Sequence, residues 1–200
     1  MSAVLSLLVK GGPVMIPLAL CSLLALATIL DRVWFWLRLG GTRDAGRVHE
    51  LAARGKWDDA LDAGRRSRSP VARTLAPGIA HRHGEPARAM ETAARDELGH
   101  ARRGLPVLDT IITLSPLLGL LGTVTGMIAA FGIMSTAGMS QPHAITGGVA
   151  EALIATAAGL GIAICSLVPY NAFLARTERL TEALEREGSR LELLLSEPRP

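Results

Sequence analysis

An acidic residue within an apolar segment is the first candidate for chemistry in this sequence. Glu151 lies near the start of the apolar segment 147–170, and no Asp, Glu, Lys or Arg occurs between Thr110 and Ala150. An ionised carboxylate at membrane depth costs a few kcal/mol when it has no partner. Glu151 must therefore face water, face a partner or carry a proton. The structural alternative places it near the outer interface, paired with a headgroup or a polar loop.

Hydroxyl side chains accompany this carboxylate on surfaces made of small residues. Such surfaces allow close contact between membrane helices, and hydroxyls hold a proton or water without bearing charge. The simpler alternative is that these surfaces only pack helices and that the hydroxyls bond their own backbone. The candidate packing residues are Gly119, Gly122, Gly126 and Gly159, and the candidate proton-pathway residues are Thr123, Thr156 and Glu151.

Three apolar segments predict an all-α membrane protein. A helix of about 20 apolar residues crosses the hydrocarbon core. Such segments occur within residues 1–37, 105–134 and 147–171, and the link 135–146 between the last two is uncharged. A cleavable signal peptide is the competing interpretation of the first segment. We favour a first transmembrane helix, because the Trp34–Trp36 aromatic cluster is typical of a membrane interface.

The remaining segments are charged and predict helices in water. Residues 38–104 contain 14 basic and 9 acidic residues, a surplus of five positive charges. Short amphipathic helices are expected near 43–54, 56–67, 70–82 and 86–103, and residues 172–200 are expected to continue the third span as a helical tail. Because basic loops stay in the cytoplasm, three spans place the N-terminus outside and the C-terminus inside.

Other chemistries are less well supported by the residue pattern. The basic cluster Arg65–Arg68 is interpreted as a solvated face at the membrane surface rather than a nucleic-acid site. His81 and His83 have no cysteine or carboxylate at ligand spacing, so no metal and no cofactor are expected. The sequence has no HExxH or GxSxG motif, and no histidine lies within five residues of Glu151 to form an acid/base pair with it. We therefore do not expect an enzyme.

Two long motifs resemble a known family. The segment Gly119–Met127 is similar to the second-span motif of the MotA/TolQ/ExbB proton channel family, and Gly148–Leu160 resembles its third-span signature, which ends at Tyr170-Asn171. The resemblance is strongest over 105–171. The layout of one span, a basic loop, two further spans and a tail also resembles the family, most of all its ExbB branch.

The resemblance implies a homopentamer in the bacterial inner membrane. Its second and third spans would surround single-span helices of an ExbD-like partner. Thr123, Glu151 and Thr156 would then be the pore residues, and proton motive force would drive TonB-dependent transport across the outer membrane through a TonB-like protein. The alternatives are a TolQ-like subunit of the Tol envelope system and a non-conducting scaffold whose small residues only pack helices.

Overall fold

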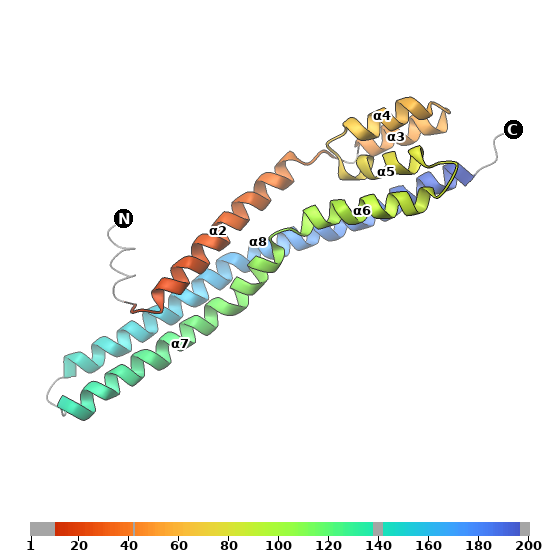
Figure 1. Cartoon of the computed structure of the whole chain (residues 1–200). Helices are drawn as coiled ribbons and strands as arrows, with labels where there is room; N and C mark the ends of the chain where they lie inside the picture. The colour runs from red at the N-terminus through yellow and green to blue at the C-terminus, as the bar shows by residue number, and fades with distance from the viewer. Residues whose placement is uncertain (1–10, 42, 138–141, 197–200) are drawn as a thin grey trace. The chain divides into compact units, whose positions relative to one another are not determined.

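The structure is a computed structural model that describes residues 11–41, 43–137 and 142–196, and every regular element in these ranges is an α-helix (Figure 1). The prediction of an all-α fold is confirmed for these residues, and the structure contains candidate membrane-spanning helices. The helices are α2 (Met15–Arg38), α3 (Arg43–Ala53), α4 (Trp57–Arg66), α5 (Pro70–Ala80), α6 (Pro86–Arg102), α7 (Leu105–Ala137) and α8 (Pro142–Ser196).

The chain divides into two compact units. The apolar unit contains the chain up to Asp31 together with Gly104–Asn171. The polar unit contains Arg32–Arg103 together with the chain from Ala172 onward. Helices α2 and α8 therefore contribute residues to both units, as the prediction of a third span that continues as a helical tail requires.

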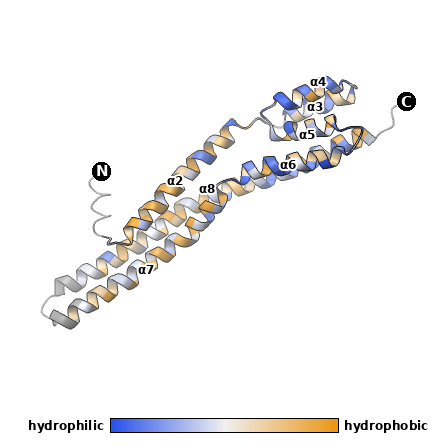
Figure 2. Ribbon diagram, in the orientation of Figure 1, coloured by the Kyte–Doolittle hydropathy of each residue, from blue (hydrophilic) through white to orange (hydrophobic). Residues whose placement is uncertain are grey.

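The apolar unit exposes the side chains that a water-soluble fold would bury. Large aliphatic side chains on all three of its helices are more than half exposed, and Figure 2 shows the same segments coloured as hydrophobic. Three helical stretches of the described residues are long and apolar enough to cross a membrane. An apolar surface of this extent is stable against lipid or another apolar protein surface. Examples are Ile16 on α2, Leu117 and Ile128 on α7, and Leu153 and Ile164 on α8.

The connection between α7 and α8 is shorter than the predicted link 135–146. Helix α7 continues to Ala137 and α8 already begins at Pro142, while residues 138–141 lie outside the described part. Residues 135–137 contain no proline or glycine that would end α7. Pro142 suits a first helical position, because its missing N–H group has no helical partner there. Helical structure thus extends into both ends of the uncharged segment 135–146.

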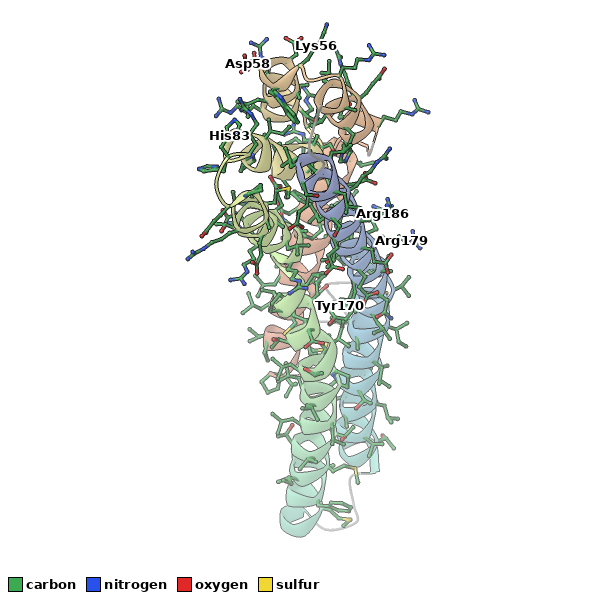
Figure 3. The ribbon with its side chains drawn as sticks, turned by 90° about the vertical axis from the view of Figure 1, so that its right-hand side faces the viewer. Lys56, Asp58, His83, Tyr170, Arg179 and Arg186 are labelled. Atoms are coloured by element: carbon green, nitrogen blue, oxygen red, sulfur yellow. The ribbon has the colours of Figure 1, made fainter. Side chains whose placement is uncertain are left out.

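The polar unit has a core of its own. Helices α3 to α6 begin and end within two residues of the predicted ranges. Proline starts both α5 and α6, where its fixed φ suits the first turn. Charged side chains such as Lys56, Asp58 and Arg186 lie on its surface (Figure 3). The core is built mainly from Val48, Val71, Leu75, Ile79, Leu184 and Leu191.

A histidine is buried in this polar unit. The side chain of His49 is 3% exposed, and its Nε2 lies 3.1 Å from Oε2 of Glu187. Burial lowers the pKa of His49 below its usual 6.5, and Arg190 adds to this effect. Glu187 acts in the opposite direction without overcoming the loss of hydration. The folded unit therefore holds His49 in its neutral form more strongly than the unfolded chain does.

We predict that the polar unit loses stability as the pH falls below 6.5. Above pH 6.5 His49 is neutral in both states, whereas below it the unfolded chain binds a proton that the folded unit resists, until the lower folded pKa is passed. The three tryptophans, Trp34, Trp36 and Trp57, all belong to the polar unit. Urea unfolding of the extracted protein, followed by tryptophan fluorescence above and below this pH, measures the effect.

The matched variants are His49→Gln and His83→Gln. His83 is exposed, so its replacement should leave the pH dependence as in the wild type. His49→Gln should flatten it, because the buried titrating group is gone. An equally steep pH dependence in His49→Gln and in the wild type would contradict this explanation.

Candidate functional site

Helices α7 and α8 approach so closely in the apolar unit that glycine is required on both. A Cβ atom built on Gly119 would lie 3.0 Å from Thr156 Cα, and one on Gly126 would lie 3.0 Å from Ala152 Cβ. On α8, a Cβ atom at Gly159 would overlap the carbonyl oxygen of Ser115. All four glycines singled out from the sequence lie in close contacts, since a Cβ atom on Gly122 would lie 2.6 Å from Ala155 Cβ.

This close approach brings a threonine hydroxyl to the backbone of the other helix. Thr156 Oγ1 on α8 donates a hydrogen bond of 2.9 Å to the carbonyl oxygen of Gly119 on α7. A side chain on Gly119 would push the two backbones apart and lengthen this bond. Thr123 behaves differently, because its Oγ1 donates to Leu120 within α7 at 2.7 Å. Both threonines are half-buried.

The carboxylate of Glu151 lies against the start of α2. A Cβ atom built on Gly12 would overlap Glu151 Oε1, so the carboxylate occupies the space that any larger residue at position 12 would fill. Gly12 also has a φ of 72°, a conformation that favours glycine. The first turn of a helix carries the positive end of its dipole, which stabilises a nearby negative charge. Because Gly12 has no side chain, the half-buried Glu151 carboxylate lies near the positive end of the α2 dipole, which favours a negative charge.

An apolar cluster borders this place. Val14, Met15 and Leu18 of α2 pack with Ala155 of α8, and all four are buried. The Glu151 carboxylate therefore lies beside an apolar cluster and near the N-terminal end of a helix, whose dipole favours a negative charge. Carboxyl groups are among the side chains that serve as general acids and bases, so Glu151 is a candidate for proton transfer.

The structure assigns the three predicted proton-pathway residues to different neighbours. Glu151 contacts the start of α2, Thr156 contacts α7, and Thr123 bonds within its own helix. The five-residue spacing of Glu151 and Thr156 turns their side chains about 140° apart on one helix. Among the described residues, no group of three or more His, Cys, Asp or Glu side chains could hold a metal ion.

Gly12 is the site residue that the sequence analysis missed. Its contact with Glu151 joins residues far apart in the chain, so no local periodicity indicates it. The only local signal is the Gly11-Gly12-Pro13 sequence, which is typical of a turn before a helix.

The segment that contains this site is similar to a known protein family. Residues 66–186 match the model of the MotA/TolQ/ExbB proton channel family. The chain belongs to this family. The matched residues include Thr123, Glu151 and Thr156, whereas Gly12 lies before them.

Two similar proteins from one organism align with most of the chain. The chain is 40% identical over 200 aligned residues to the "Putative biopolymer transport protein ExbB-like 1" of Synechocystis sp., covering 94% of this chain and 77% of the relative. ExbB-like 3 of the same organism is 33% identical, covering 92% and 91%. The Tol-Pal system protein TolQ of Pseudomonas aeruginosa is 43% identical over a shorter stretch, 47% of this chain and 41% of TolQ.

We predict that Gly159→Ala weakens the contact between α7 and α8. The added methyl group overlaps the Ser115 carbonyl oxygen, and overpacking of this kind costs about 1–3 kcal/mol. Gly161→Ala is the matched control on the same helix, because a Cβ atom there has no neighbour within 4 Å. The measurement is the thermal midpoint of the extracted protein by circular dichroism. Equal midpoints for the two variants would contradict the close contact.

Proposed function

We propose that the chain is an ExbB-like subunit of a proton-driven motor in the bacterial inner membrane. The observation that carries the proposal is the Glu151 carboxylate, which lies in the apolar unit against the start of α2. In this arrangement Glu151 takes up and releases protons, and Thr156 keeps α8 in register against α7 beside it. The family membership and the ExbB-like relatives support the same assignment.

The proposed assembly is a homopentamer around single-span helices of an ExbD-like partner. The N-terminus lies outside and the C-terminus lies inside, because the basic segment 38–104 remains in the cytoplasm. The exposed aliphatic side chains on α7 and α8 supply apolar surface for neighbouring copies, for the partner helices and for lipid. The complex would use proton motive force to drive a TonB-like protein and, through it, transport across the outer membrane.

A TolQ-like role in the Tol envelope system is the second candidate. It is favoured by the 43% identity to Pseudomonas TolQ, although that match covers 47% of this chain, against 94% for the ExbB-like relative. The two roles differ in the partner that the motor drives. Co-purification with a TonB-like protein, or with a Pal-like or TolB-like protein, separates them.

A non-conducting scaffold is the remaining alternative. It would use the same glycines for packing and would have no need of a carboxylate at position 151. Replacing Glu151 while preserving its shape therefore separates a scaffold from a proton-conducting subunit.

We predict that Glu151→Gln abolishes proton flux through the complex of this chain with its single-span partner. The glutamine amide has nearly the same shape as the carboxyl group, so assembly is retained. The amide does not bind and release a proton near neutral pH, so proton transfer at this position is lost. Flux into liposomes under an imposed membrane potential, reported by an internal pH dye, is the measurement. Glu182→Gln, an exposed position in the polar unit, should conduct like the wild type.

Thr156→Val separates packing from conduction. It preserves the volume and removes the hydrogen bond to Gly119, and such bonds within membranes contribute about 0.6 kcal/mol on average. The variant should therefore assemble with a small loss of thermal stability.

Wild-type proton flux in Glu151→Gln, with the protein fully assembled, would refute the proposed proton role of Glu151 and leave the non-conducting scaffold as the explanation.

A further inference from the structure

A cavity in the polar unit has the features of an anion site. It has a volume of about 360 Å³ and lies between the segment that follows α2, the start of α5 and the polar-unit part of α8. Two arginines of α8, Arg176 and Arg179, contribute to its lining, and no acidic residue does so among the described residues. The cavity therefore has a net positive lining.

The two arginines differ from the paired arginines of this unit. Arg54, Arg73 and Arg95 each contact a carboxylate. Arg176 and Arg179 are exposed, and neither makes an ion pair with any residue that the structure describes; Figure 3 shows Arg179 on the outer side of α8. Guanidinium groups without a carboxylate partner are suited to binding phosphate, for which their planar fork provides two parallel donors.

The N-terminus of α5 adds a second source of positive field. Pro70 begins this helix, and the Ser69 side chain before it makes no capping hydrogen bond. Helix N-termini attract phosphate, because unpaired N–H groups and the helix dipole act on the same ion. Ser69 and Pro70 both line the cavity, so this helix end opens at the same site as the two arginines.

Two buried polar atoms in the lining lack a partner among the described residues. Ser69 is 1% exposed and its Oγ makes no hydrogen bond. The indole Nε1 of Trp36 is also buried without an acceptor. Unsatisfied buried polar groups are uncommon in folded proteins and call for a missing partner. Ser69 and Trp36 both line the cavity, so an anion bound there is a candidate acceptor for these two groups.

The rest of the lining is apolar. Leu37 and Leu39, which follow the apolar segment of α2, and Leu180 of α8 form part of the wall. A site with a cationic end and an apolar wall fits the headgroup region of an anionic phospholipid. We propose that this cavity binds a phosphate group, carried by an anionic lipid headgroup or free in solution.

Gly41 provides a test that does not alter the arginines. It lines the cavity, and a Cβ atom built there meets nothing within 4 Å, so a larger residue fits without a clash. Gly41→Asp places a negative charge at the site, and Gly41→Asn is its neutral match. Because a carboxylate beside the two arginines repels an anion and competes with it for the guanidinium groups, we expect Gly41→Asp to weaken phosphate binding about tenfold relative to Gly41→Asn.

The experiment is isothermal titration of the detergent-extracted full chain with short-chain phosphatidylglycerol, short-chain phosphatidylcholine and inorganic phosphate. Arg176→Gln combined with Arg179→Gln should weaken binding to a similar degree. Lys56→Gln combined with Arg65→Gln removes the same charge from exposed positions outside the lining and should have no effect.

Each result bears on the proposal. Binding of phosphatidylglycerol alone supports the site and assigns it to a lipid headgroup, whereas binding of inorganic phosphate supports the site with a soluble source. Absence of binding to either ligand would overturn the proposal. Binding that is equally strong in Gly41→Asp, Gly41→Asn and the double arginine variant would also overturn it, because the ligand would then lie elsewhere.

Discussion

The contact between the Glu151 carboxylate and Gly12 is the interaction on which this account depends. An acidic group in an apolar segment needs a polar neighbour, a partner or a proton. The structure supplies the first turn of α2 and leaves the carboxylate room only because position 12 has no side chain. The segment that leads into α2 and the start of the last apolar helix therefore meet at an acidic side chain.

The small residues of α7 and α8 make this arrangement possible. Gly119, Gly126 and Gly159 allow the two backbones to approach until a hydroxyl on one helix reaches a carbonyl oxygen on the other. Packing between membrane helices depends on such close contact, because lipid provides no hydrophobic driving force between them. The same faces leave large aliphatic side chains on the outside, where lipid or further subunits can cover them. Tight internal packing and an apolar exterior therefore follow from one distribution of side-chain sizes.

The positions of the helices, and the residues chosen as candidates for the site, could be predicted from the sequence because both rest on local signals. Proline and glycine positions placed α3 to α6 within two residues, and the isolated charge of Glu151 drew attention to α8. The tertiary contacts of the candidate residues could not be predicted from the sequence. Thr156 bonds to a carbonyl 37 residues away in the chain, and a backbone acceptor has no sequence signature. The contact of Gly12 with Glu151 and the contact of the buried His49 with Glu187 likewise join segments that are distant in the chain.

The most direct test is to observe protonation of Glu151 itself. Infrared difference spectra of the complex in lipid nanodiscs, recorded while the pH is changed, report the carbonyl stretch of a protonated carboxyl group. We predict a carbonyl band at low pH that is absent in Glu151→Gln and retained in Glu182→Gln, an exposed position in the polar unit. Identical difference spectra for the wild type and Glu151→Gln would contradict it.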